Sequence, residues 1–282
     1  ETSMLWWACF CAGLGHGVVE AVINPLCAAI YRNDKSKMLN ILHAAWPAGL
    51  AIGGTIYLLL DPAPDQWRMV FWVMLIPVAM YGILFSLCTH YPVDERVEAN
   101  IPMREMLAEF GAFGGFLAIT FLFYELATQA GHFVGAAIPH LLPISLLVGV
   151  VGGAVFGWSV RSMGRPLFFI LCLIMIPLAT AELATDHWIR TLMEPVLRNE
   201  YTLDAGWAIV ASASIMMVLR FFAGIPLKFL SPPALLLFSS VFSMVGLYLL
   251  SGATGGIIFL AFVFYAVGQT FYWPTMQGFV SE

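Results

Sequence analysis

The stretch GLGHGVVEAVINPL, residues 13–26, lies inside an apolar run that extends from Met4 to Tyr31. A run of that length can cross the hydrocarbon core of a bilayer, which needs about 20 helical residues. It nevertheless carries a carboxylate, Glu20, near its middle, at a cost of about 3 kcal/mol on insertion scales. Residues three or four apart share one face of a helix. The sequence therefore predicts a span whose small and polar face points at protein or water: Gly13, His16, Gly17, Glu20, Asn24 and Cys27.

The composition is typical of an integral membrane protein. Hydrophobic residues make up 61% of the chain and charged residues 10%, whereas soluble domains contain about 25% charged residues. The net charge of −5 provides no basic surface, so we expect no nucleic-acid partner. The five cysteines lie in or beside apolar runs without the CxxC spacing of a metal site. We interpret them as small core residues and expect no metal and no cofactor.

Apolar runs separated by short polar connections predict an all-α polytopic membrane protein with about nine spans. The chain starts at Glu1 and stops at Glu282, and we expect an excerpt that is incomplete at both ends. Residues 189–204 are expected to be one of the polar connections. The expected spans are residues 4–31, 39–60, 69–88, 111–133, 141–160, 167–187, 205–222, 234–251 and 255–278.

Basic residues predict the orientation, because cytoplasmic connections are enriched in Lys and Arg. If the first span ends inside, the outer connections hold only Arg68, Arg190 and Arg198. This bias predicts a multi-pass protein of the cell (inner) membrane. The inner connections hold Arg32, Lys35, Lys37, Arg96, Arg104, Arg161, Arg165, Arg220 and Lys228, of which the last four lie in cytoplasmic turns.

The connection at residues 92–110 predicts a helix of its own. Pro102 is suited to the first turn of a helix, and Met103, Met106, Leu107 and Phe110 would then line one face. Such a helix would lie on the cytoplasmic surface and link two bundles. The alternative is a solvated, charged loop.

Three stretches carry a family resemblance. A glycine-rich segment leads to Glu20-x-x-x-Asn24-Pro25, a second span starts with Leu39-Asn40-x-x-His43, and the chain ends with GQTFYWPTMQGFVSE, residues 268–282. They resemble, in this order, the fourth, fifth and tenth spans of the major facilitator superfamily, and within it the fucose/hexose-type sugar permeases. Residues 205–224 resemble the eighth span of that family.

The resemblance implies two packed helical bundles of the major-facilitator type. Residues 1–91 would be the remainder of the N-terminal bundle (spans 4–6), 92–110 the linker, and 164–282 part of the C-terminal bundle (spans 7–10). Residues 111–163 would form an extra helix pair, which implies a fourteen-span variant. An alternative register counts that pair as spans seven and eight. The family's cytoplasmic G-x-x-x-D-R-x-G-R turn is degenerate here, because Arg161 occupies the position of the acid.

Proline spacing also links the two ends of the chain. Glu20 precedes Pro25 by five residues, and Gln269 precedes Pro274 by five. Spans interrupted by proline in corresponding places of two halves are typical of transporters built from repeats. We therefore expect a secondary transporter of a small polar solute, most simply a sugar, driven by protons through alternating access.

The candidate site residues fall into three groups, and each could instead be structural. Glu20, His16, Asn24 and His43 are candidates for proton coupling or solute binding. A cavity wall of aromatic and amide side chains suits the C–H face and the hydroxyls of a sugar; its candidates are Trp46, Tyr265, Gln269, Tyr272 and Trp273. An outer gate could be formed by Glu182, Asp186 and Trp188, which could equally be solvated.

Two other functions compete with this reading. The first is an uncoupled facilitator or a solute sensor on the same fold. The second is a membrane-embedded transferase, which would need reactive groups at the interface. For that function the sequence offers only Asp186, His187 and Glu194, and it contains no HExxH, GxSxG or paired-Asp motif. We therefore do not expect an enzyme.

Overall fold

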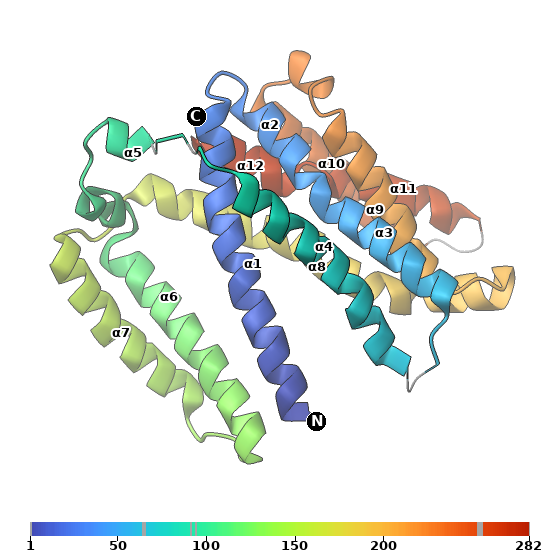
Figure 1. Ribbon diagram of the computed structural model, residues 1–282, viewed down its shortest axis with the longest axis horizontal. Coiled ribbons are helices and arrows are strands. Elements are labelled where there is room, and N and C mark those ends of the chain that lie inside the picture. Colours follow the sequence, from blue (N-terminus) through green and yellow to red (C-terminus); the bar gives the residue numbers. More distant parts are fainter. Residues whose placement is uncertain (1, 64–65, 91, 94, 253–255, 282) are drawn as a thin grey trace. The chain divides into compact units, whose positions relative to one another are not determined.

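The computed structural model describes residues 2–63, 66–90, 92–93, 95–252 and 256–281 (Figure 1). Within these ranges the chain is helical and contains no strand, which confirms the all-α prediction. The helices are α1 (Thr2–Ile30), α2 (Lys35–His43), α3 (Ala45–Leu60), α4 (Trp67–Leu87), α5 (Glu95–Glu98), α6 (Met103–Val134), α7 (Leu141–Val160), α8 (Pro166–Tyr201), α9 (Gly206–Phe221), the 3₁₀ turn η2 (Pro226–Lys228), α10 (Pro232–Gly252), α11 (Ile257–Gln269) and α12 (Tyr272–Ser281).

Nine helical segments of the described chain are long and apolar enough to cross a membrane. Each overlaps one of the spans that the sequence predicts, so the chain is an integral, multi-pass membrane protein. The segments are Met4–Ile30, Lys35–Leu60, Arg68–Leu87, Met103–Val134, Leu141–Val160, Pro166–Tyr201, Gly206–Lys228, Pro232–Gly252 and Ile257–Val280.

The expected polar connection at residues 189–204 is wrong, because α8 continues through it as far as Tyr201. Ile189, Met193 and Leu197 follow one another at intervals of four residues and are all buried. They form an apolar cluster with residues of α9 and α11, including Ala208 and Phe262. An apolar stripe at helical spacing gains burial when the helix extends, and this gain outweighs the polar character of the other faces.

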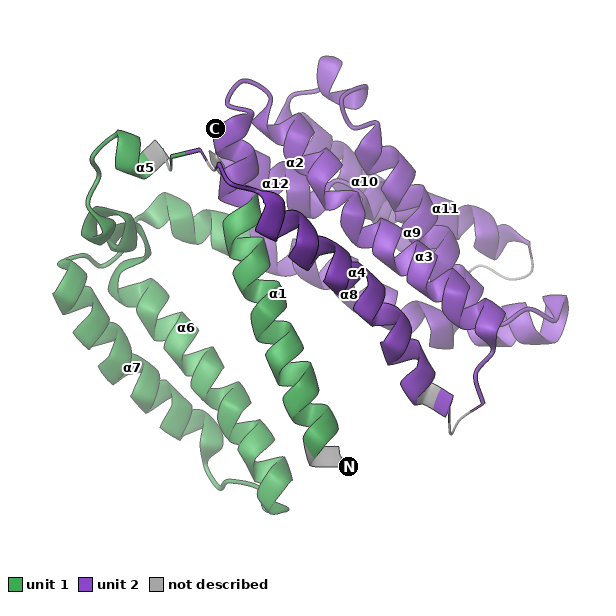
Figure 2. Cartoon of the chain, in the orientation of Figure 1, with its two compact units in different colours: residues 1–23, 93–174 green, residues 24–92, 175–282 purple. Residues whose placement is uncertain are grey.

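The chain divides into two compact units, which Figure 2 shows in different colours. Unit 1 comprises residues 1–23 and 93–174, and unit 2 comprises residues 24–92 and 175–282. These units do not test the domain division predicted from the sequence, which remains a prediction. Both α1 and α8 contribute one part to each unit.

In unit 1, α6 and α7 pack closely along a stripe of small residues. Ser145, Gly149, Gly153 and Gly157 follow every fourth position of α7 and are buried. A Cβ on Gly153 would lie 2.7 Å from the backbone nitrogen of Phe116 on α6. Close approach of backbones at small residues is how helices associate in lipid, where burial of apolar surface provides no driving force.

The start of α6 is separated from its long apolar part by Gly111, whose φ of +57° breaks the helical geometry. A Cβ there would lie 2.0 Å from the backbone nitrogen of Gly164, in the turn after α7. That turn is fastened to the break by hydrogen bonds from Ala112 N to Ser162 O (2.9 Å) and from Arg165 N to Glu109 O (3.0 Å). Residues 103–110 are therefore helical where the sequence predicts a linker helix.

Unit 2 contains α2–α4 and α9–α12, with the end of α1 and the larger part of α8. Within it α3 packs along α9, α11 packs along α10 and α9, and α12 packs against α2. Close contact again depends on glycine: a Cβ on Gly268 would lie 2.3 Å from Ser243 N, and one on Gly278 would lie 2.7 Å from the Cα of Ser36.

Two of the predicted spans are interrupted inside unit 2. The span 39–60 is divided at Ala44 between α2 and α3, and the span 255–278 is divided at Thr270 and Phe271 between α11 and α12. Each interruption precedes a proline, Pro47 or Pro274, by three or four residues. By contrast, α1 remains one helix through Pro25.

The glycine stripe of α7 yields a stability prediction. Gly153→Ala would force the backbones of α6 and α7 apart, because the new methyl group would meet backbone atoms that cannot move independently. We expect a loss of about 1–3 kcal/mol in the free energy of unfolding, measured by thermal unfolding in detergent.

Gly82→Ala on α4 is the matched control, because a Cβ there meets no described atom within 4 Å. It should change stability by less than about 0.5 kcal/mol. Equal effects of the two substitutions would contradict the close packing of α6 on α7.

Candidate functional site

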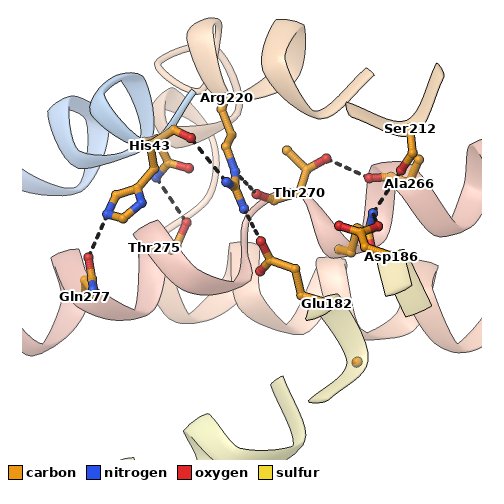
Figure 3. Close-up of polar contacts among 12 residues, drawn as sticks. His43, Glu182, Asp186, Ser212, Arg220, Ala266, Thr270, Thr275 and Gln277 are labelled. Atoms are coloured by element: carbon orange, nitrogen blue, oxygen red, sulfur yellow. Dashed lines mark hydrogen bonds and ion pairs between the residues drawn. The ribbon is translucent and has the colours of Figure 1, made fainter. Parts of the chain in front are cut away.

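The most deeply buried charged group of unit 2 is the guanidinium of Arg220, in the last turn of α9. Its Nη2 forms an ion pair with Oε1 of Glu182 on α8 at 2.7 Å, and the two side chains are 1% and 6% exposed. Two further hydrogen bonds run from Nε to Thr270 O (2.6 Å) and from Nη1 to His43 O (3.2 Å). Figure 3 shows this side chain between the three acceptors. Arg220 therefore connects α8, α9 and both interrupted spans.

The two carbonyl groups that Arg220 binds are free because of prolines. Proline has no N–H, so the carbonyl four residues earlier loses its helical donor. Pro47 leaves the carbonyl of His43 without that donor, and Pro274 does the same for Thr270. In an apolar surrounding an unpaired carbonyl costs about 1–3 kcal/mol. The planar, forked guanidinium can serve both carbonyls and a carboxylate at once.

A second polar group lies beside the first, around Gln269 at the end of α11. The Nε2 atom of this fully buried side chain donates to Oδ1 of Asp186 (3.2 Å) and to Oγ of Ser212 (3.0 Å). One turn earlier on α11, the hydroxyl of the buried Tyr265 donates to the carbonyl of Ala181. Helices α8, α9 and α11 thus direct polar atoms at one interior region.

A third polar group joins α2 to α12 and to the end of α1. Asn40, which is fully buried, donates from Nδ2 to Oγ1 of Thr275 at 3.2 Å. Nε2 of His43 lies 3.1 Å from Oδ1 of Asn24 and 2.9 Å from Oε1 of Gln277. The first and third groups share His43, and the second lies next to the first in the sequence, because Gln269 precedes Thr270 and Asp186 is one turn after Glu182. We call the three groups together the polar network of unit 2.

Several buried oxygen atoms of this network have unused hydrogen-bonding capacity. Among the described residues no partner contacts Oε2 of Glu182, Oε1 of Gln269 or Oδ1 of Asn40. The hydroxyl groups of Ser239 and Ser243 on α10 are in the same position. Buried polar atoms are rarely left unpaired, so each such atom requires an explanation. An ion, water or solute could supply the missing partners.

The structure brings several sequence candidates together. Glu182 pairs with Arg220, Asp186 with Gln269, and Asn24 with His43. Tyr265 and Tyr272 are buried, and the hydroxyl of Tyr272 donates to Ser239 O at 3.3 Å. Trp273 is half-buried, whereas Trp46 and Trp188 are exposed.

Glu20 lies elsewhere, on the part of α1 that belongs to unit 1. Its side chain is 34% exposed, and Oε2 lies 3.7 Å from Nε2 of His16, one turn earlier. The carboxylate that the structure buries completely is therefore that of Glu182. Desolvation of an acid depends on neighbouring helices, which the pattern of a single span does not reveal.

The basic residues of the expected cytoplasmic turns also differ in how deeply they are buried. Arg161 and Lys228 are exposed, and Arg165 pairs with Glu109 at 2.9 Å while remaining 73% exposed. Arg220, in contrast, is an interior residue and not part of a solvated turn. Its long side chain follows the end of α9 inward, where carboxylate and carbonyl acceptors replace water.

Sequence reasoning missed Ser212, Thr270 and Thr275 as network members. Serine and threonine are common in apolar spans, so their type carries little information. The free carbonyl of Thr270 had a usable signal, since Pro274 follows four residues later. Within the described ranges the structure contains no group of three or more His, Cys, Asp or Glu side chains arranged to hold a metal ion.

No family model matches this chain, and comparisons with curated proteins and with solved structures also find no match. The major-facilitator resemblance of the motifs is therefore a prediction that independent comparison does not test.

The buried ion pair yields a stability prediction. Arg220→Leu would leave the Glu182 carboxylate buried without its cation, and such a loss costs about 3–5 kcal/mol. Arg220→Leu combined with Glu182→Leu removes both charges and should recover much of that loss. Thermal unfolding of Arg220→Leu, Glu182→Leu and the double variant in detergent measures the interaction energy between the two residues.

The exposed pair Arg198 and Glu194, also at 2.7 Å, is the matched control. Arg198→Leu should cost less than about 1 kcal/mol, because an exposed pair is screened by water. If the double variant were as unstable as Arg220→Leu alone, the buried charge of Glu182 would not be the cause.

The proline effect can be tested separately. Pro274→Ala restores a backbone N–H that can bind the carbonyl of Thr270 and so competes with Arg220. We expect the interruption between α11 and α12 to close, with slower amide hydrogen exchange at residues 271–275. Pro77→Ala in α4 is the control, and it should leave exchange at those residues unchanged. Unchanged exchange in both variants would show that Pro274 does not cause the interruption.

Proposed function

We propose that this chain is part of a secondary active transporter that carries a small polar solute, a sugar, across the cell (inner) membrane by proton-coupled alternating access. The observation that carries the proposal is the polar network of unit 2. Ionisable groups in membrane spans are costly and mark ion and substrate pathways. Here a carboxylate, a guanidinium and an amide are completely buried among helices of membrane-spanning length.

The interrupted spans support the same function. In many transporters substrates and coupling ions bind where helices are broken, because freed backbone groups and helix ends face the site. In unit 2 the interruptions at Ala44 and at Thr270 both adjoin Arg220. Tyr265, Gln269 and Tyr272 lie beside the second interruption, where aromatic rings and an amide suit a sugar. The motifs that resemble fucose/hexose-type permeases of the major facilitator superfamily point to the same class of solute.

The transport test uses the full-length protein in vesicles, with radiolabelled L-fucose and D-glucose as probes. We expect an inward proton gradient to drive accumulation above the external concentration, and a protonophore to abolish it. Equilibration without accumulation would identify an uncoupled facilitator. Absence of both uptake and sugar exchange would contradict transport of these sugars.

Glu20 is the acid proposed for proton coupling. Glu20→Gln should reduce accumulation at least tenfold, because the neutral amide cannot release a proton. Sugar exchange without a gradient should continue. Glu200→Gln on α8, at an exposed position, is the control and should accumulate sugar like the wild type. Unchanged accumulation by Glu20→Gln would remove Glu20 from the coupling role.

A further inference from the structure

The region between α8, α9 and α11 holds more negative than positive charge. Glu182 and Asp186 are one turn apart on α8, and Arg220 forms an ion pair with Glu182 alone. Its Nη2 binds Glu182, while its other two bonds go to backbone carbonyl groups. Asp186 receives a hydrogen bond from the neutral amide of Gln269 instead. With both acids ionised, one negative charge is left without a cation.

The remaining titratable groups that face this region do not correct the imbalance. Tyr265 on α11 is neutral and uses its proton to bind the carbonyl of Ala181. His187 is exposed and its Nδ1 lies 2.8 Å from Leu183 O. His43, behind Arg220, contacts Asn24 and Gln277. Glu182 is buried and Asp186 is half-buried, so an uncompensated negative charge on this pair is unfavourable, and a bound positive charge would offset it.

One buried oxygen points to where that charge is bound. Oε1 of the fully buried Gln269 has no hydrogen-bond partner among the described residues, whereas the buried Glu182 carboxylate interacts with Arg220 and with the backbone N–H of Trp273. The Nε2 atom of the same Gln269 amide contacts Asp186 and Ser212, so its Oε1 atom lies in the same region. A carboxylate oxygen and an amide carbonyl oxygen are acceptors only. The missing partner must therefore be a cation or a proton donor.

We propose that Glu182, Asp186, Gln269 and Ser212 form a binding site for a single monovalent cation, either a proton or a sodium ion, in addition to the coupling role proposed for Glu20. Figure 3 labels three of these side chains, with Glu182 beside Arg220 and with Asp186 and Ser212 near Ala266. One charge balances the cluster, whereas a divalent ion would leave an excess positive charge. Oxygen ligands suit hard cations such as sodium. The site rests on the polar network that also supports the proposed transport function.

The test measures cation binding without any solute. The purified full-length protein is unfolded thermally in sodium chloride and in choline chloride of equal concentration, and at several values between pH 5 and pH 8. A ligand that binds only the folded state stabilises it. Saturable stabilisation by sodium identifies a sodium site. Stabilisation on lowering the pH in choline identifies a proton site, because stability rises toward low pH when the folded state binds more protons.

Asp186→Asn keeps the shape of the side chain and removes the excess charge. It should be at least as stable as the wild type in choline and should lose the response to sodium or to pH. Gln269→Met removes the acceptor Oε1 together with the Nε2 donor that contacts Asp186 and Ser212, and it should weaken apparent cation affinity about tenfold. If Asp186→Asn does not fold, Gln269→Met tests the cation site in its place. Glu200→Gln should respond like the wild type.

A wild-type protein that responds to neither cation would overturn the site, as would Asp186→Asn or Gln269→Met variants that respond like the wild type. These outcomes are separable from failure of the transport function, because no sugar is present. If the protein binds the cation but carries neither probe sugar, the cation site stands and the proposed solute is wrong. If it carries sugar without any response to the cation, the transport function stands and the cation site is wrong.

Discussion

The arrangement of unit 2 depends on one requirement, that the buried guanidinium of Arg220 has an acceptor in every direction in which it donates. A charged group removed from water is stable only when its hydrogen bonds and its charge are both satisfied. Glu182 supplies the charge and one acceptor, and the carbonyls of His43 and Thr270 supply the others. Three helical segments that are distant in the sequence are thereby held around one side chain.

The prolines give this arrangement its specificity. An uninterrupted helix uses all of its interior carbonyl groups, so it offers nothing to a neighbouring guanidinium. Pro47 and Pro274 each free one carbonyl at the level of Arg220. The cost of interrupting a helix and the cost of burying a guanidinium are both reduced by the same hydrogen bonds. Irregular backbone is tolerated in membrane proteins where other groups satisfy it.

The two units use different means of holding helices together. In unit 1 the contact between α6 and α7 is made by glycines such as Gly149 and Gly153, which allow close backbone approach. In unit 2 glycines at the contacts coexist with polar and charged side chains whose capacity is not completely used. A fully satisfied network would lock the helices. In the transport function proposed above, these unused acceptors would let an ion or a solute change the balance between arrangements, as alternating access requires.

The sequence by itself determined the class of protein, the number of spans of membrane-crossing length and most of their bounds, because apolar length is a property of each segment alone. Proline spacing also marked the interruption before Pro274, but the same spacing at Pro25 was misleading, because α1 continues through that residue as one helix. Only the tertiary structure decided that Arg220 is an interior residue, that Glu182 is buried more deeply than Glu20, and that α8 continues to Tyr201. Burial and pairing of a charge depend on which helices are adjacent, and adjacency is not encoded in the periodicity of any one span.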